Sequence, residues 1–318
     1  MATVNRRTFL GASASAALTS AAPADSPIPI IDTHIHLYDP TRPQGVPWPP
    51  KGGKVPYQPM LPDTFRKVTK PFGVVGAIEV ECSPWLEDNQ WVLDVIAKDT
   101  IMLGTVGDLE PGKPDFRKHL DRFHKDKHFL GIRFAYLWGR DLASEIAKPQ
   151  CIADLKAMAD AGLEMDTFGG PALLADVLRI TDQVPNLRVV IDHLANQEVP
   201  KEPAARAKYE GQLRELGKRP QVYVKISEVL QHVGDRVPYE LSYYRPKLDH
   251  YWEVFGPDRL IYGSDWPNSE TVGTYAQVFG LVREYFMAKG HEAAEKFFWK
   301  NSVAAYRWSK REAGQPGR

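Results

Sequence analysis

Eight short apolar runs, rich in Val and Ile, alternate with longer amphipathic segments along this chain, and this alternation most constrains the fold. The runs are IPIIDTH (28–34), GVVGAIEVE (73–81), IMLGTVGD (101–108), LGIRFAY (130–136), LEMDTFG (163–169), LRVVIDH (187–193), VYVKISE (222–228) and RLIYGSD (259–265). Strand-like runs that alternate with helix-length segments predict βαβ units and a parallel sheet. Eight of them in 318 residues predict a single-domain (β/α)₈ TIM barrel. A doubly wound open sheet is the alternative, but no Gly-x-Gly-x-x-Gly follows the first run.

The segments between the runs have helical patterns. We expect a helix over 88–98, with Asp88 as its N-cap, and another over 171–183, with Pro171 at its first position. Further helices are predicted over 203–218, 271–288 and 291–299.

Residues 38–62 interrupt this pattern because they are dense in Pro and Gly and too long for an ordinary connection in a barrel. The segment contains Trp48 and Tyr57, which favour an ordered loop over a floppy one. In a barrel, the loop would lie over the carboxyl-terminal face, where such enzymes have their active sites. We interpret it as a binding loop or lid after the first strand.

The first 25 residues are typical of an export signal. Arg6 and Arg7 precede Phe9-Leu10 and a short Ala/Ser-rich tract with small residues around 22–24. This predicts a twin-arginine-type signal over 1–25, a barrel domain over 26–318, and a periplasmic or otherwise exported protein. The alternative is an ordinary Ala-rich leader. No other segment approaches the about 20 apolar residues of a membrane helix, so no membrane insertion of the mature protein is expected.

Charge and cysteine content exclude several classes of protein. Forty Lys and Arg balance forty Asp and Glu, so no global field favours nucleic acid or anionic membranes. Cys82 and Cys151 are too few for a disulfide framework, and we expect buried thiols. The expected partner is a small-molecule substrate, and an oligomer is possible.

Two histidines end the first run. Because side chains at i and i+2 share one face of a strand, His34 and His36 can converge on one point in the barrel mouth. Paired imidazoles suit a divalent transition metal. By itself a His-x-His pair is a weak signal.

Charged side chains recur at the ends of the later runs, which strengthens this interpretation. The residues concerned are Glu79, Glu81, Arg133, Asp166, Asp192, His193, Lys225 and Asp265. Charges buried in a core are costly without a partner or a metal. Gathered at one end of a barrel, the same residues form an active site.

Three of these runs carry a resemblance to a known family. The segments IDTHIHLYDP, VVIDHL and RLIYGSDWP resemble the first, sixth and eighth strand signatures of the amidohydrolase superfamily. Within it, the chain resembles the amidohydrolase-related branch that contains sugar-lactone and dicarboxylate lactonases, and the resemblance spans about 28–308. It implies a metal-dependent (β/α)₈ hydrolase that acts on the C–O ester of a lactone or, in sister groups, on C–N or C–C bonds.

The resemblance also implies roles for individual residues. His34 and His36 match metal ligands of the first strand, and Asp265 matches an aspartate that binds metal and accepts a proton. His193 matches a histidine that binds metal or polarises the substrate. Glu81 is a candidate extra metal ligand or a substrate contact.

Two departures limit the expected number of metal ions. Binuclear members have a bridging lysine or glutamate on strand four and a histidine on strand five, where this chain has Arg133 and Asp166. We therefore expect one divalent ion, zinc or alternatively manganese. Some lactonases of the branch work without a metal, so no ion at all is the other possibility.

The expected mechanism is attack on a lactone carbonyl by a water that Asp265 deprotonates. His193 or Arg133 would stabilise the oxyanion, and Arg133 could instead clamp a carboxylate. Asp166, Lys225, Trp85 and Trp266 are further candidate substrate contacts, although Lys225 could simply pair with Glu81 or Asp265 and the tryptophans could be packing residues. Asp192 is expected to face away from the mouth, because it precedes His193 on a strand.

Two other functions remain open. One is a metal-dependent decarboxylase or hydratase of the same superfamily, which would use the same histidines and aspartate. The other is a binding protein that keeps the barrel without its chemistry.

Overall fold

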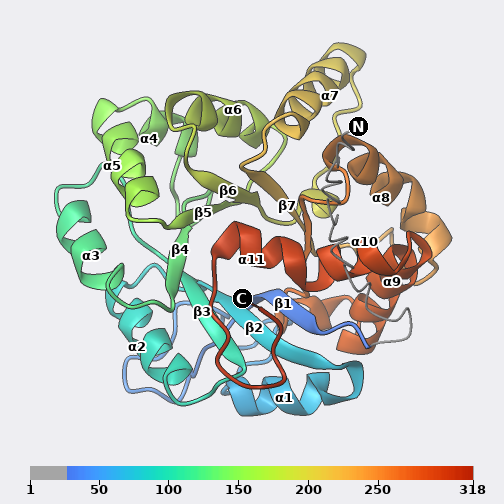
Figure 1. Cartoon of the computed structure of the whole chain (residues 1–318), viewed down its shortest axis with the longest axis horizontal. Helices are drawn as coiled ribbons and strands as arrows, with labels where there is room; N and C mark the ends of the chain where they lie inside the picture. The colour runs from blue at the N-terminus through green and yellow to red at the C-terminus, as the bar shows by residue number, and fades with distance from the viewer. Residues whose placement is uncertain (1–26, 318) are drawn as a thin grey trace, which may run out of the picture.

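Eight strands follow one another in chain order around one sheet, in which every strand is parallel to the next. The computed structural model describes residues 27–317 (Figure 1). The strands are β1 Ile30–Ile35, β2 Val74–Val80, β3 Met102–Gly107, β4 Phe129–Arg133, β5 Glu164–Thr167, β6 Arg188–Ile191, β7 Val222–Ile226 and β8 Leu260–Tyr262. Each of the eight overlaps one of the predicted runs. The expected single-domain (β/α)₈ barrel is confirmed.

The barrel is nearly closed, and its closing contacts lie beside the predicted site. Ile35 and Trp266 form an isolated parallel bridge between the end of β1 and the segment after β8. The His36 amide donates to the Trp266 carbonyl at 2.8 Å, and the Asp265 amide donates to the His34 carbonyl at 2.8 Å. The first and last strand ends are thereby held next to each other.

Helices surround the sheet (Figure 1). The α-helices are α1 Pro62–Thr69, α2 Leu86–Ile96, α3 Phe116–Phe123, α4 Leu142–Ile146, α5 Pro149–Asp160, α6 Leu173–Gln183, α7 Pro203–Gly217, α8 Leu241–Phe255, α9 Tyr275–Ala288, α10 His291–Glu295 and α11 Asn301–Tyr306. Short 3₁₀ turns occupy η1 Lys70–Phe72, η2 Leu194–Asn196 and η3 Asn268–Thr271, and η4 Lys296–Lys300 is a π-helical turn.

Some expected helix starts are wrong. α2 begins at Leu86 rather than Asp88, and the Asp88 carboxylate pairs instead with Arg42 at 2.9 Å. α9 begins at Tyr275, because Thr274 and Gln277 form a reciprocal capping box that fixes its first turn. Pro171 lies two residues before α6. Only for Asp88 does a side-chain partner from another segment, Arg42, account for the difference.

The apolar side chains of the strands divide between two layers. Val189 and Ile191 belong to the large cluster that also contains Val177 and Ile180 of α6, whereas Val190 belongs to a second cluster with Tyr306. This division follows from the alternation of side chains along a strand. It accounts for the near-continuous apolar runs, because strands of a parallel barrel are buried on both faces.

The carboxyl-terminal segment covers the amino-terminal ends of the strands. Arg188, at the start of β6, donates to the Ala305 carbonyl at 2.6 Å, and Gln315 donates to the Val75 carbonyl at 3.0 Å. In Figure 1, α11 lies across the centre of the ring of strands. The carboxyl ends of the strands therefore form the opposite end of the barrel, where the predicted site residues lie.

The long Pro/Gly-rich loop after the first strand is present between β1 and α1. Its two ends meet in an antiparallel bridge between Tyr38 and Met60. The Trp48 ring lies 5.3 Å from the His36 ring and 5.4 Å from the Tyr38 ring, measured between centroids. Tyr57 is partly exposed. The loop thus brings one aromatic side chain to the end of β1.

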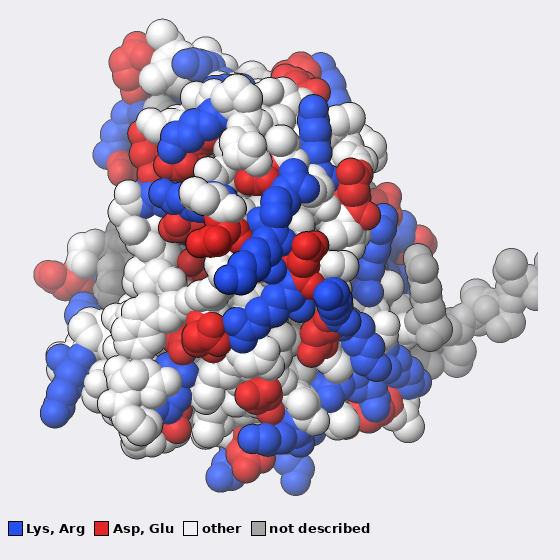
Figure 2. All heavy atoms as spheres, turned by 90° about the vertical axis from the view of Figure 1, so that its left-hand side faces the viewer, with Lys and Arg blue, Asp and Glu red and all other residues white. Residues whose placement is uncertain are grey.

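The surface charge, the cysteines and the length of the helices were also subjects of prediction. Lys and Arg are interspersed with Asp and Glu over the face shown in Figure 2. Both cysteines are buried and free. No helix in the described part of the chain is long and apolar enough to cross a membrane. The expected export signal over 1–25 lies outside the described residues.

Candidate active site

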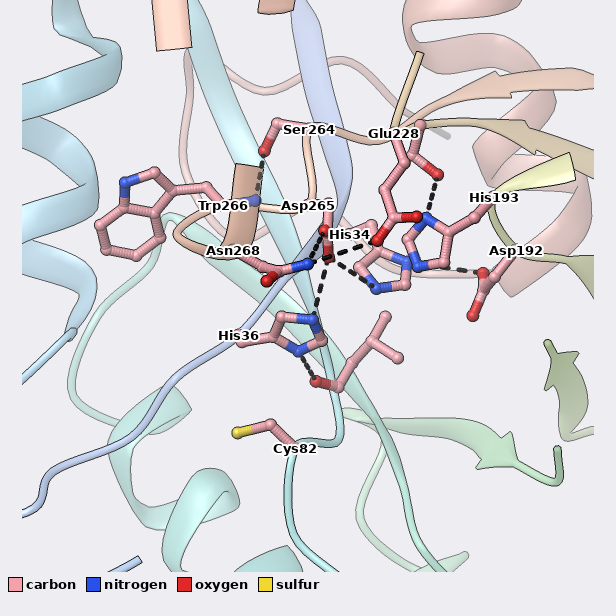
Figure 3. A network of polar contacts seen from close by, with 12 residues as sticks. His34, His36, Cys82, Asp192, His193, Glu228, Ser264, Asp265, Trp266 and Asn268 are labelled. Atoms are coloured by element: carbon pink, nitrogen blue, oxygen red, sulfur yellow. Dashed lines mark hydrogen bonds and ion pairs between the residues drawn. The ribbon is translucent and has the colours of Figure 1, made fainter. Parts of the chain in front are cut away.

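Polar side chains from the first, sixth, seventh and eighth strands converge at the carboxyl end of the barrel (Figure 3). His34 is the fifth residue of β1 and His36 follows its end. Asp192 and His193 directly follow β6, and Asp265 lies three residues beyond β8. All five are at least 95 % buried. The strand order therefore brings together residues up to 231 positions apart in the chain.

His36 is fixed in one tautomer and faces Asp265. Its Nδ1 lies 2.8 Å from the Val80 carbonyl oxygen, which can only accept, so Nδ1 carries the proton. Its Nε2 lies 3.0 Å from Asp265 Oδ1. Burial, assisted by the charge of Arg133, lowers the pKa of His36 to about 4. The imidazole is therefore neutral, and its Nε2 lone pair points at a carboxylate oxygen.

His34 lies between the barrel interior and Asp265. Its Nε2 is 3.5 Å from Asp265 Oδ1 and is buried without a hydrogen-bond partner in the described chain. Its Nδ1 is 3.2 Å from Lys225 Nζ and 3.5 Å from Asp192 Oδ1. Burial lowers the pKa of His34 well below its ordinary range.

The donor set at this point fits a divalent metal ion. The fit rests on the unpartnered His34 Nε2 and on the His36 Nε2 lone pair that meets a carboxylate oxygen. In a tetrahedral zinc site with bonds of about 2.0–2.1 Å, neighbouring ligand atoms lie about 3.3 Å apart. The 3.0 and 3.5 Å separations from Asp265 Oδ1 agree with that value. His34, His36 and Asp265 are the residues that would hold such an ion.

Glu81, a candidate extra ligand, is placed differently. Among the described residues, it belongs to none of the groups whose ligand atoms lie within 4.8 Å of one another. Its carboxylate oxygens accept from Trp138 Nε1 at 3.1 and 3.3 Å, and one accepts from the Ser83 amide at 3.0 Å. Burial raises the pKa of Glu81 to about 7. This geometry places Glu81 outside the set of candidate metal ligands, while its side chain still lines the end of the barrel.

A buried ion network lies beneath the histidines. Lys225 Nζ is 2.7 Å from Asp166 Oδ2 and 2.8 Å from Asp192 Oδ1, and all three side chains are fully buried. Asp166 also accepts from the Tyr306 hydroxyl at 3.0 Å. Lys225 therefore pairs with neither Glu81 nor Asp265.

Asp192 was expected to face away from the mouth, because it precedes His193 on a strand. This expectation is wrong. The second carboxylate oxygen of Asp192, Oδ2, lies 3.2 Å from Arg133 Nε. Asp192 therefore contacts two cationic side chains, Arg133 and Lys225, and also His34. Despite its burial, Lys225 and Arg133 hold the pKa of Asp192 below its usual range. The reason is local: β6 ends at Ile191, and His193 has a left-handed backbone with φ of 53°. Strict strand alternation ends before these two residues.

His193 and Arg133 form one pair within the site. Arg133 can only donate, so its contact of 3.3 Å with His193 Nε2 places the histidine proton on Nδ1. That nitrogen donates to the Ser227 hydroxyl at 2.8 Å. Burial lowers the pKa of His193 well below its ordinary range, so the ring is neutral.

A cavity of about 170 Å³ opens over these groups, and we call it the mouth cavity. Its lining residues are His36, Trp48, Glu81, Cys82, Arg133, Leu137, Trp138, Phe168, His193, Glu228, Asp265 and Asn268. Among them Arg133 supplies the single cationic side chain, and three residues are acidic.

Four of the expected substrate contacts do not line the mouth cavity. Asp166 and Lys225 are fully buried in the ion network below it. Trp266 is fully buried, packs against Phe65 with tilted rings and donates to Glu270 at 3.0 Å. Trp85 is 39 % exposed on the outside. Direct contact with a substrate in this cavity is therefore not supported for these residues.

Glu228 and Asn268 were missed by the sequence reasoning. Asn268 donates to Asp265 Oδ2 at 2.6 Å and to Glu228 Oε1 at 3.3 Å. Burial raises the pKa of Glu228 to about 8 and that of Asp265 to about 6. Glu228 ends the run VYVKISE, so its position at a strand end was the signal that could have revealed it.

Backbone strain marks the same cavity. Among the described residues, five other than glycine have a positive φ, and four of them line the mouth cavity: Trp138, His193, Glu228 and Asp265. Each such conformation costs roughly 1–3 kcal/mol and persists where the surroundings impose it, often at functional sites. Asp265 has φ of 62°, which turns its carboxylate toward both histidines.

Comparisons with known proteins agree with this geometry. The family model described as Amidohydrolase matches residues 31–308. L-fucono-1,5-lactonase of Burkholderia ambifaria is 29% identical over 250 residues, which cover 77% of this chain and 82% of the relative. L-fucono-1,5-lactonase of Burkholderia multivorans is 25% identical over 297 residues, covering 86% of this chain and 94% of the relative.

A solved structure is similar in fold. It is an amidohydrolase from Burkholderia multivorans with bound zinc, which superposes with a TM-score of 0.76 at 20% identity and covers 88% of this chain and 99% of its own. The family match covers residues 31–308, which include all eight strands after the first residue of β1 and the site residues at their carboxyl ends. The chain therefore belongs to the amidohydrolase family and is a hydrolase.

Proposed function

We propose that this protein hydrolyses a small neutral lactone with one divalent metal ion, which is held by His34, His36 and Asp265. Zinc is the preferred ion and manganese the alternative. The observation that carries the proposal is the convergence of two neutral imidazoles on one oxygen of Asp265, at 3.0 and 3.5 Å, beside a cavity that contains Arg133. The two lactonases among the relatives support the choice of a ring ester as substrate.

The residues of the site have separable tasks in such a reaction. A bound divalent ion would polarise a carbonyl oxygen and lower the pKa of a neighbouring water. Asp265 accepts the proton of the attacking water, while Asn268 holds its second oxygen at 2.6 Å. The guanidinium of Arg133 stabilises the negative charge that develops on the carbonyl oxygen. Asp265 then returns the proton to the ring oxygen as it leaves.

The charges around the mouth cavity favour a neutral substrate over a dicarboxylate. Glu81, Glu228 and Asp265 face one cation, Arg133, which already pairs with Asp192 at 3.2 Å. Among the residues that line the cavity, a substrate carboxylate would find no cationic side chain that is free of another carboxylate, so its desolvation would be poorly offset. Trp48, Trp138 and Phe168 offer apolar faces of the kind on which a sugar ring packs.

Substrate profiling tests the proposal. Purified protein would be given aldono-1,5-lactones, unsubstituted lactones, a carboxylated lactone and hydroxylated aromatic acids, while acid release and carbon dioxide are measured. Asp265→Asn protein at the same concentration corrects for spontaneous lactone opening. We expect rapid opening of neutral hydroxylated lactones and little reaction with the carboxylated one.

Other outcomes would assign the other functions. Carbon dioxide release from an aromatic acid, with every lactone inert, would make the protein a decarboxylase. Addition of water to a double bond would make it a hydratase. Tight binding of these compounds without turnover would make it a binding protein.

We also propose that the protein is exported to the periplasm through a twin-arginine-type signal. The proposal is supported by Arg6-Arg7 followed by Phe9-Leu10 and an Ala/Ser-rich tract. Replacing Arg6 and Arg7 by lysine should retain the protein in the cytoplasm, as measured by cell fractionation. Unchanged export of that variant would contradict the proposal.

A further inference from the structure

A second hollow, of about 320 Å³, adjoins the mouth cavity, and we call it the side groove. The two share Glu228, Asp265 and Asn268, so the reacting carboxylate lies at their junction. Their linings differ. The mouth cavity has aromatic walls, whereas the side groove is lined mainly by polar residues. Besides the shared residues these are Asn196, Gln231, His232, Ser269 and Thr271, together with the apolar Leu230 and Val272.

Glu228 is held at this junction without a cation. Its Oε1 accepts from Asn268 Nδ2 at 3.3 Å, and its Oε2 accepts from Asn196 Nδ2. Within the described chain, no Lys or Arg lies within ion-pair distance of its carboxyl group. Its φ of 48° is strained for a residue other than glycine and places it at the boundary of both hollows. The mechanism above gives this side chain no task.

Ser269 supplies an independent observation. It lines the side groove, and only 4% of its surface is exposed. Its hydroxyl is buried without a hydrogen-bond partner in the described part of the chain. A buried hydroxyl without a partner is unfavourable, so a ligand in the side groove that reaches this group would be stabilised by pairing with it. The Ser269 amide is already used, because it donates to the Asp265 carbonyl at 2.9 Å.

We propose that the side groove is a hydroxyl-binding lobe of the active site, in which Glu228 and Ser269 bind hydroxyl groups of a polyhydroxylated lactone. The inference rests on the proposed lactone hydrolysis and adds the part of the substrate that is recognised. Hydroxyl groups both donate and accept, so they can pair with the Glu228 carboxyl group and with the Ser269 hydroxyl. The lactone carbonyl then lies at Asp265, between the two lobes.

Ser269→Ala is the sharpest test, because the folded protein loses no hydrogen bond of its own. We expect an unchanged melting temperature and a KM for a polyhydroxylated 1,5-lactone that rises about 3- to 10-fold, the effect of one net hydrogen bond. Hydrolysis of δ-valerolactone, which has no hydroxyl groups, should be affected much less. Ser144→Ala, at an exposed position of α4, is the matched control and should resemble the unmodified protein for both substrates.

Glu228→Met keeps the length of the side chain and removes both oxygens. We expect a loss of about 10- to 100-fold in kcat/KM for the polyhydroxylated lactone, since both carboxyl oxygens proposed to pair with its hydroxyl groups are removed, and a much smaller loss for δ-valerolactone. Glu198→Met, on an exposed segment, is its control. Equal losses for both lactones in both variants would overturn the proposal.

A binding measurement separates this inference from the proposed reaction. A 1,5-anhydrohexitol has the ring and hydroxyl groups of such a lactone but no carbonyl, so its affinity by calorimetry does not depend on turnover. We expect weaker binding by Ser269→Ala than by the unmodified protein. Equal binding by the two, or no binding by either, would overturn the lobe even if lactones are hydrolysed. Weaker binding in the variant without any lactone turnover would reject the reaction and keep the lobe.

Discussion

His36 and Asp265 lie 229 residues apart, and the Nε2 of the first is 3.0 Å from Oδ1 of the second. The Val80 carbonyl fixes the proton of His36 on Nδ1, so a lone pair and a carboxylate oxygen face each other. His34 Nε2 approaches the same oxygen. A cation bound between these atoms would relieve the repulsion of the lone pairs that face Asp265 Oδ1.

Metal binding should depend on His36. The purified protein is expected to hold about one equivalent of a divalent ion, as in a three-ligand catalytic site. His36→Ala should hold far less after dialysis, because one of three ligands is gone. Metal analysis by mass spectrometry measures this, with His124→Ala, after α3, as the control. Equal metal content in His36→Ala and the unmodified protein would exclude His36 as a ligand.

Asp265→Asn should reduce kcat by about 10²–10⁴, the contribution of a positioned general base. An amide can keep the contact with Asn268 but cannot take a proton, so the fold should be retained. Lactone hydrolysis and the far-ultraviolet circular dichroism spectrum measure the two effects. Asp258→Asn, whose side chain is 69% exposed, is the control and should retain full activity. A fully active, folded Asp265→Asn protein would contradict the mechanism.

Lys225→Met should lower the free energy of unfolding by about 3–5 kcal/mol, because breaking a buried ion pair leaves an uncompensated charge. Here two carboxylates, Asp166 and Asp192, would lose their common cation. Urea denaturation measures the change. Lys218→Met, at an exposed pair with Glu215, should alter stability by less than about 1 kcal/mol.

The double variant Lys225→Met with Asp166→Asn refines this prediction. Removing one of the stranded charges should recover part of the lost stability. If the double variant is as unstable as the sum of the two single variants, the residues do not act as one network.

Glu164→Gln should stabilise the protein at high pH more than at low pH. Burial, and next the charge of Asp166, raises the pKa of Glu164 well above its ordinary value, and neither carboxyl oxygen has a hydrogen-bond partner in the described chain. As pH rises above the ordinary carboxyl range, the unfolded chain releases this proton while the folded chain keeps it. The folded state then binds more protons, so stability falls with rising pH.

An uncharged glutamine removes that dependence. Denaturant unfolding at pH 4 and pH 8 should show the larger gain for Glu164→Gln at pH 8. Glu198→Gln, on an exposed side chain, should show no such difference. A loss of stability that is equal at both pH values would mean that shape, rather than charge, decides the effect at this position.

The sequence was sufficient to predict the barrel and one side of the site. Apolar runs such as LRVVIDH specify buried strands because their hydrophobic pattern is local. His34 and His36 could be paired for the same reason, since alternate residues of a strand share a face. Trp266 was a candidate substrate contact but lies fully buried in the core. A residue after a strand end can turn toward the core or toward the cavity, and local sequence does not distinguish the two.

Asp192 shows why local reasoning failed elsewhere. Alternation placed it opposite His193, but β6 ends at Ile191 and the positive φ of His193 lets both side chains reach the site. The same kind of backbone turn positions Glu228 and Asp265. Such conformations are imposed by tertiary contacts and leave no periodic trace in the sequence.

The sequence by itself therefore determined the order of strands and helices and the residue types available at each strand end, because both follow from short-range hydrophobic patterning. Only the tertiary structure decided which of those residues meet. The near closure of the barrel brings Asp265 to His34 and His36, and the buried Lys225 pairs with Asp166, Asp192 and His34, which come from three other strands or strand ends. The physical reason is that a buried charge takes its partners from the whole fold, across distances along the chain that no local pattern records.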